Sequence, residues 1–260
     1  MSDDDRPSYV RNWEVGSTNT AREQYVSVGG RTLKLTQQPG AGLVGASLWD
    51  SAVLLCRYLS LPDAEPLLDR IRGRRLIELG CGCGLLGMAL SLHGATLVTL
   101  TDKADVLPHT RANLAANGFG ENDGRLTVLP YQWGTKAEEL SPPYDAIVAT
   151  DVVYLEAQIG PFIASLHALA GPSTTIVLAI ERRDPAVMSA FLAALKAGFK
   201  VKAAPARTLR RLVPEDEAAA EYIALLIAHP RKRAAQCSPQ LDDAQVASAA
   251  CEPNSALGAP

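Results

Sequence analysis

Three carboxylates stand at the ends of apolar segments, where they could bind a positively charged ligand. Glu78 is the third residue of the segment LIEL and the first residue of the glycine-rich segment ELGCGCGLLG. Asp102 ends the segment TLTD, roughly twenty residues later, a spacing typical of an acidic residue that binds a ribose. Asp151 follows the apolar segment AIVAT. Because the carboxyl ends of parallel strands meet at one edge of a sheet, these carboxylates are expected around one site.

The glycine-rich segment predicts a ligand that comes close to the backbone. Residues 82–87 match the dinucleotide pattern G-x-G-x-x-G, so a nicotinamide coenzyme is one alternative. Glu78, however, would repel a pyrophosphate and suits the ammonium and sulfonium groups of S-adenosylmethionine. Asp102 can accept the ribose hydroxyls of either ligand. A turn without any ligand is a further alternative, whereas a P-loop is excluded because no Gly-Lys-Ser/Thr follows.

The surrounding segments alternate between strand and helix patterns. A β-hairpin is predicted at about 24–36, on both sides of a Gly-Gly pair. A helix is predicted after Ser47, with Asp50 completing a capping box, and it should end before Pro62. From residue 76 onward the alternation predicts parallel strands with helices on both faces. The last two strands, FKVKAA and EYIALLIAH, have only a loop between them, so the last strand should be antiparallel.

Composition limits the class of protein and its partners. The 260 residues are 47% hydrophobic and 20% charged, which is typical of one globular domain. The net charge of -3 provides no general attraction for nucleic acid or an anionic membrane. Five scattered cysteines and an acidic, polar N-terminus without an apolar signal segment favour the cytoplasm, with the nucleus as the alternative.

Five short segments in a fixed order carry a family resemblance. They are LWDSA from Leu48, ELGCGCGLLG from Glu78, TD ending at Asp102, YQWG from Tyr131 and DVVY from Asp151. Together they resemble the seven-β-strand S-adenosylmethionine-dependent methyltransferases, and specifically their family 16 branch of protein-lysine methyltransferases. The resemblance covers about half of the chain, residues 41–160.

The resemblance implies a fold and a division of the chain. The fold is α/β, a Rossmann-like seven-stranded sheet with order 3-2-1-4-5-7-6 and strand 7 antiparallel, beside the N-terminal hairpin. We therefore expect an N-terminal extension with the hairpin at 1–40 and a methyltransferase domain at 41–230. Residues 231–260 are rich in Ala, Ser, Pro and Gln and are expected to form a disordered tail.

The motifs and the resemblance together predict a cofactor site and an acceptor site. The residues expected to bind S-adenosylmethionine are Trp49, Glu78, Gly80, Gly82, Gly84, Asp102, Trp133 and Ala149. The resemblance implies that the acceptor is a lysine ε-amine of another protein, with Asp151 orienting the amine and Tyr154 lining its channel. Only the neutral amine can attack the methyl group, although the reference pKa of lysine is about 10.4.

Other interpretations of these residues stay open. Trp49 and Trp133 also fit roles in packing, and Asp151 also fits a loop cap. The segment ERR at 181–183 follows a strand on the same edge and fits local ion pairs better than contact with an acidic substrate. No metal site is predicted, because the Cys-x-Cys of the glycine-rich segment lacks a second pair of ligands.

The sequence thus predicts an enzyme that methylates lysine in a protein partner, acting as a monomer without nucleic acid or membrane. The alternatives are a methyltransferase for a small molecule or another protein side chain, and a non-catalytic binding protein with this fold. The segment PPY at 142–144 resembles part of a motif of nucleic-acid amino-methyltransferases. It precedes the strand YDAIVATD rather than following it, so it does not support a nucleic-acid substrate.

Overall fold

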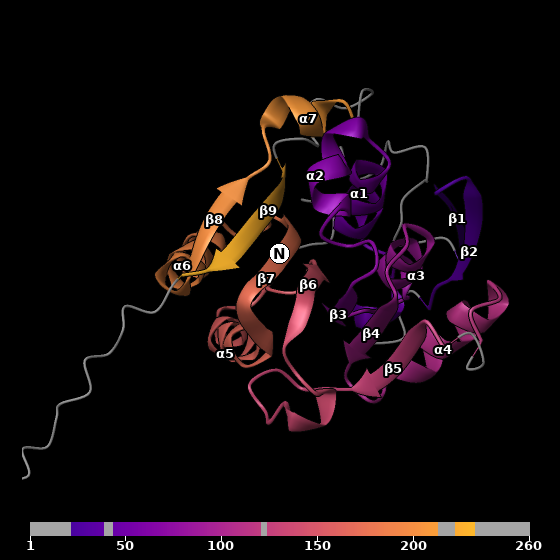
Figure 1. Ribbon diagram of the computed structural model, residues 1–260, viewed down its shortest axis with the longest axis horizontal. Coiled ribbons are helices and arrows are strands. Elements are labelled where there is room, and N and C mark those ends of the chain that lie inside the picture. Colours follow the sequence, from indigo (N-terminus) through magenta and orange to yellow (C-terminus); the bar gives the residue numbers. More distant parts are fainter. Residues whose placement is uncertain (1–21, 39–43, 121–123, 213–221, 232–260) are drawn as a thin grey trace, which may run out of the picture.

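A central sheet with helices on both faces and a separate hairpin make up the protein (Figure 1). The computed structural model describes residues 22–38, 44–120, 124–212 and 222–231. The strands are β1 (Glu23–Val28), β2 (Arg31–Thr36), β3 (Arg75–Leu79), β4 (Leu97–Asp102), β5 (Leu126–Pro130), β6 (Tyr144–Thr150), β7 (Ala170–Glu181), β8 (Phe199–Ala203) and β9 (Ile223–Pro230). The α-helices are α1 (Asp50–Leu59), α2 (Glu65–Leu68), α3 (Leu85–Leu92), α4 (Leu107–Ala116), α5 (Ile159–Leu169), α6 (Pro185–Gly198) and α7 (Ala206–Arg210). Short 3₁₀ helices are η3 (Val44–Ala46), η4 (Pro62–Ala64), η6 (Glu138–Leu140) and η7 (Glu156–Gln158).

The seven-stranded sheet confirms the predicted strand order. Its order is β5-β4-β3-β6-β7-β9-β8, which is 3-2-1-4-5-7-6 when β3 is counted as the first strand. Neighbours among β5, β4, β3, β6 and β7 pair in parallel. β9 is antiparallel to both β7 and β8, as expected for a strand that follows β8 without a long crossover helix.

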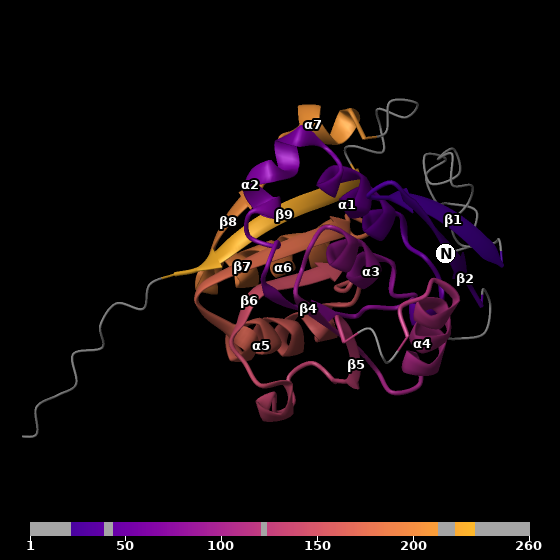
Figure 2. The same ribbon diagram turned by 45° about the vertical axis from the view of Figure 1, so that its right-hand side comes forward.

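Two hydrophobic clusters fill the space between the sheet and its helices. Leu54, Leu55 and Leu90, from α1 and α3, belong to the first cluster, on one face of the sheet. Phe162 and Phe191, from α5 and α6, belong to the second, on the opposite face. Figure 1 shows α1 and α3 on the side of the hairpin and α5 and α6 on the other, and Figure 2 agrees.

The start of α1 differs from the prediction. The helix begins at Asp50, and its N-cap residue Trp49 makes no side-chain capping bond, so the capping box from Ser47 is wrong. The backbone N–H of Leu48 donates instead to the side-chain oxygen of Gln37, at 2.6 Å, and Trp49 is extended. A contact with the segment after the hairpin therefore delays the helix. Every residue of α1 except Arg57 is buried, so the helix is enclosed on nearly all sides and not on one face alone.

The predicted hairpin is present and is held by α4. β1 and β2 pair in antiparallel fashion across a turn in which Gly29 and Gly30 both have positive φ. Asn117 accepts a hydrogen bond from the backbone N–H of Lys34 at 2.9 Å and donates to its carbonyl at 2.6 Å. Asn113, one helical turn earlier, accepts from Thr36 N–H at 2.8 Å. Two asparagines on one helix face thus satisfy the outer edge of β2 much as a neighbouring strand would.

Several sequence predictions concern residues beyond the described ranges. Most of the extension at 1–40 and nearly all of the tail at 231–260 lie outside them, so the division into three parts stays a prediction. Within the described ranges, no helix combines the length and the apolar character that a membrane crossing needs.

Candidate active site

The glycine-rich loop joins β3 to α3 and depends on glycine at three positions. Gly80, Gly82 and Gly84 have φ values of 73°, 49° and 82°, in the left-handed region that other residues rarely adopt. A Cβ atom on Gly82 would lie 2.9 Å from the carbonyl oxygen of Gly45 in η3. Glycine therefore lets η3 approach the loop, and Gly84 caps the N-terminus of α3.

A cavity of about 620 Å³ lies where this loop meets the carboxyl ends of β4 and β6. Eight of the ten predicted site residues line it: Trp49, Glu78, Gly80, Gly82, Asp102, Trp133, Asp151 and Tyr154. Gly84 and Ala149 do not line the cavity. Ala149 is fully buried within β6, where it pairs with Leu178 of β7. The predicted cofactor and acceptor residues thus meet at one place in the fold.

Acidic side chains outnumber basic ones among the described residues that line the cavity. Carboxylates come from Glu78, Asp102, Asp105 and Asp151, whereas Lys103 brings the one positive charge among the described residues that line it. Such a wall attracts a cationic ligand and repels a pyrophosphate. The described residues contain no cluster of His, Cys, Asp and Glu arranged for a metal ion.

Glu78 is a buried carboxylate with hydrogen-bonding capacity to spare. Its side chain is nearly inaccessible, and its Oε2 atom has no hydrogen-bond partner among the described residues. Burial raises the pKa of Glu78 well above its ordinary value; the nearby backbone N–H of Gly87 opposes this, and the charge of Asp102 adds to it. An unpaired buried carboxylate beside a cavity suits a ligand that carries a positive charge or a donor.

Asp102 lies at the end of β4 and binds the glycine-rich loop directly. Its two carboxylate oxygens accept from the backbone N–H groups of Gly82, at 2.9 Å, and Lys103, at 2.8 Å. Burial raises the pKa of Asp102, and these two N–H groups oppose that change. Each oxygen keeps a second lone pair, so the carboxylate can still accept from a ligand hydroxyl.

Asp151 occupies a strained position immediately after β6. Its φ of 54° lies in the left-handed region, which is unusual for a residue other than glycine and is often found at functional sites. The Oδ1 atom accepts from the backbone N–H of Glu181 at 3.3 Å, and Oδ2 forms an ion pair with Arg183. Burial raises the pKa of Asp151 to about 6, although the Arg183 charge acts in the opposite direction.

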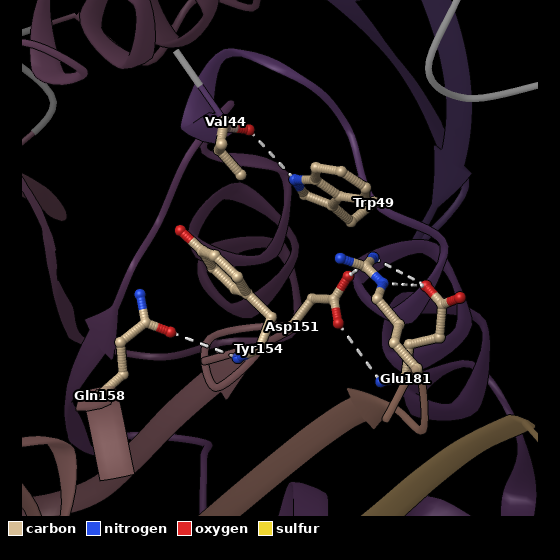
Figure 3. A network of polar contacts seen from close by, with 7 residues as sticks. Val44, Trp49, Asp151, Tyr154, Gln158 and Glu181 are labelled. Carbon is tan, nitrogen blue, oxygen red and sulfur yellow. Dashed lines mark hydrogen bonds and ion pairs between the residues drawn. The ribbon is translucent and has the colours of Figure 1, made fainter. Parts of the chain in front are cut away.

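Arg183 links Asp151 to an aromatic wall of the cavity. Its guanidinium carbon lies 4.4 Å from the centre of the Trp49 ring, and the same group is paired with Glu181 at 2.7 Å. The Trp49 indole N–H donates to the carbonyl of Val44 at 3.2 Å. Figure 3 shows Trp49, Asp151 and Tyr154 around a common space, with Glu181 to the right of Asp151.

The role of Arg183 at this site was missed by the sequence prediction. The ion pair between Arg183 and Glu181 confirms the expected local pairing of the ERR segment, but the contact with Asp151 was not foreseen. A signal existed: β6 and β7 are consecutive parallel strands, so residues after their carboxyl ends are close neighbours.

Trp133 both packs and lines the cavity. Its ring meets Phe162 edge-on, with centroids 5.0 Å apart. On the other side, a Cβ atom on Gly80 would lie 3.4 Å from the Trp133 ring. The packing role and the cavity role left open by the sequence are therefore both fulfilled by this half-buried side chain.

A family model described as "Lysine methyltransferase" matches residues 28–197, well over half of the chain. The chain belongs to the lysine methyltransferase family. It is an enzyme that uses S-adenosylmethionine, and its site fits this cofactor: Glu78 has an unpaired oxygen, and acidic side chains outnumber basic ones among the described residues that line the cavity.

Named relatives of this lysine methyltransferase align over more than half of the chain. "EEF1A lysine methyltransferase 3" of Xenopus tropicalis is 36% identical over 169 residues, which cover 65% of this chain and 72% of that protein. "Protein N-lysine methyltransferase METTL21A" of Mus musculus is 35% identical over 141 residues, or 54% of this chain and 62% of that protein. The chain thus spans less than two thirds of METTL21A.

Solved structures of similar fold include the mitomycin 7-O-methyltransferase MmcR. It matches with a TM-score of 0.50 at 14% identity, over 70% of this chain and 54% of that chain. At this identity the similarity concerns the fold alone.

Proposed function

We propose that this lysine methyltransferase methylates the ε-amine of a lysine in another protein, at the cavity beside the glycine-rich loop. The proposal rests on the positions of Asp151, Tyr154 and Trp49, which line that cavity around a common space. An aromatic pair and a carboxylate suit a long apolar side chain that ends in an ammonium group.

Bound S-adenosylmethionine supplies a methyl group made electrophilic by its sulfonium. In our proposal Glu78 lies beside the positively charged end of the cofactor, and Asp102 accepts from its ribose hydroxyls. Trp133 offers an aromatic face to the adenine. Gly80 and Gly82 line the cavity and leave room for Val152 and for the Gly45 carbonyl, while Gly84 and Ala149 act indirectly, by starting α3 and by supporting β6.

The acceptor lysine reaches the site as a cation and must react as a neutral amine. Asp151 binds the ammonium group through its carboxylate oxygens, and Tyr154 lines the path of the aliphatic chain. Trp49, which the sequence predicts to bind the cofactor, is placed in our proposal beside this path, because it lines the same cavity. The ammonium group would lose its proton to Asp151 or to water before it reacts, and Asp151 would then orient the neutral amine toward the bound cofactor. Such positioning accounts for a large part of the rate, so Asp151 need not be a strong base.

We further propose that the enzyme acts as a monomer in the cytoplasm, and that EEF1A is the first substrate to test. The name of the Xenopus tropicalis relative supports this choice of substrate. The odd number of cysteines, without the spacing of a disulfide framework, supports a reducing compartment.

Methyl transfer from labelled S-adenosylmethionine tests the proposal. The full chain and its Asp151→Ala variant are incubated with purified EEF1A and, separately, with a cell lysate. We expect label on a protein lysine with the parent enzyme and none with the variant, as read by mass spectrometry. Label confined to RNA or to small molecules would contradict a protein acceptor. Label on proteins other than EEF1A would contradict only the choice of substrate.

A further inference from the structure

Arg183 does not line the cavity itself but contacts two residues that do, Asp151 and Trp49. It lies in the turn between β7 and α6, and its terminal nitrogen donates to Asp151 Oδ2 and to Glu181 Oε2. Its Nε atom donates to the same Glu181 oxygen at 3.0 Å. The guanidinium also lies over the Trp49 ring. One side chain therefore joins the segment before α1, the loop after β6 and the turn after β7.

The two cavity-lining partners of Arg183 both need a fixed position. The Asp151 side chain is only 3% exposed, and a charge buried to this extent is costly without a partner of opposite sign. The Trp49 ring is attached to the fold by its bond to Val44 on one side and by the guanidinium on the other. A planar guanidinium can make both contacts at once, whereas the ammonium group of a lysine has no flat face to stack.

We infer that Arg183 is the positioning residue of the acceptor site: its guanidinium holds the Asp151 carboxylate and the Trp49 ring in place on the cavity wall. The role of these two partners toward a lysine rests on the proposed function. Arg183 and the Glu181 N–H each use one lone pair of the carboxylate, so lone pairs stay available for an incoming ammonium.

The arrangement predicts that Asp151 stays ionised at lower pH because Arg183 is present. The charged groups that act on Asp151 are Arg183, which favours its ionised form, and Glu181, which opposes it. Tyr154 lies on the same loop, and Glu78 borders the same cavity from β3. Without Arg183, only the hydrogen bond from the Glu181 N–H opposes burial and the Glu181 charge, so the pKa of Asp151 rises further.

Direct titration of Asp151 tests the inference without any acceptor. The carboxyl carbon is followed by NMR in the full-length protein with labelled aspartate, and Asp151→Asn assigns the signal. In Arg183→Met we expect proton binding to Asp151 to strengthen tenfold or more, which is a midpoint at least about one pH unit higher. Arg183→Gln is a second neutral variant with the same expected shift, and Arg183→Lys should restore much of the lower midpoint. The matched control is Arg182→Met, which removes an equal charge one residue away and should leave the midpoint unchanged.

Methyl transfer provides a second readout. A rise of about one unit from a pKa of about 6 lowers the ionised fraction at pH 6 from about one half to about one tenth. We therefore expect kcat/KM of Arg183→Met to fall about fivefold near pH 6 and less than twofold near pH 8.5. An unchanged midpoint of Asp151 in both neutral variants would overturn the inference. A shifted midpoint in a chain that methylates no protein would instead contradict the proposed function and leave the inference standing.

Discussion

Replacing Asp151 by asparagine should stabilise the folded protein while it removes activity. The pKa of Asp151 is about 6 in the fold, against about 3.9 for an ordinary aspartate. The folded-state pKa is raised, so ionisation costs stability, and the cost grows as pH rises between these two values. Each pKa unit corresponds to about 1.36 kcal/mol, which gives about 3 kcal/mol near pH 7.5 and about 1 kcal/mol near pH 4.5. This net cost already includes the attraction of Arg183.

The neutral side chain of asparagine removes the cost of ionising Asp151, but it loses one hydrogen bond, which is a smaller cost. Asparagine can offer its carbonyl to only one of the two donors, Arg183 or the Glu181 N–H, and losing the other costs about 1 kcal/mol. Arg183 keeps its bonds to Glu181, so it is not left without a partner. We therefore expect Asp151→Asn to raise the free energy of unfolding by about 1–2 kcal/mol near pH 7.5.

Urea denaturation at both pH values measures the effect. The gain from Asp151→Asn should be about 2 kcal/mol larger near pH 7.5 than near pH 4.5, because the parent carboxyl is mostly protonated in the fold at the lower pH. Glu139→Gln is the control, since it removes a carboxylate from an exposed position. A gain that does not depend on pH, or a loss of stability near pH 7.5, would refute the assignment of a costly charge to Asp151.

Three further changes test other parts of the site. Gly82→Ala places a Cβ atom 2.9 Å from the Gly45 carbonyl oxygen and adds about 1–2 kcal/mol of strain from the left-handed backbone. Because both residues line the cavity, calorimetry should show at least tenfold weaker binding of S-adenosylhomocysteine. Gly30→Ala has a similar φ but meets no atom within 4 Å, so it should lose stability and keep the affinity. Asp102→Ala should weaken cofactor binding about tenfold in an intact fold; an unchanged affinity would mean that the ribose binds elsewhere. Asn117→Ala removes two bonds to β2, and faster amide exchange confined to the hairpin is the expected result.

The parallel strands and the reversed last strand could be predicted from local patterns, whereas the strand order was implied by the family resemblance. Alternating strand and helix segments favour parallel neighbours, and a link between β8 and β9 without a long crossover helix favours a reversal. The start of α1 could not be predicted in the same way. Ser47 and Asp50 form a sound capping pattern, but the bond from Leu48 to Gln37 keeps the chain extended for two more residues. Such a contact joins positions whose proximity appears only in the folded chain.

The sequence could predict which strand ends form the site, but not which side chains contact one another there. Glu78, Asp102 and Asp151 meet because each lies at or next to the carboxyl end of a parallel strand of the same sheet. Which residue of the ERR segment turns back to Asp151 depends on the path of the chain after β7, and no pattern in three consecutive polar residues reveals it. The asparagines of α4 were missed for a similar reason, because their partners are backbone groups of β2.

The unfavourable features of the cavity argue for a working enzyme over a non-catalytic protein that keeps the fold. Glu78 is buried with an oxygen that has no partner among the described residues, a condition that costs roughly 1–3 kcal/mol. Asp151 adds a left-handed backbone and a charge whose pKa is raised by burial. A strand end that served only the fold could use uncharged residues at both places and be more stable. Glu78 and Asp151 line the same cavity, where a cationic cofactor and a cationic acceptor would offset both costs. An enzyme would need such destabilising residues at this cavity, whereas a non-catalytic protein with the same fold would not.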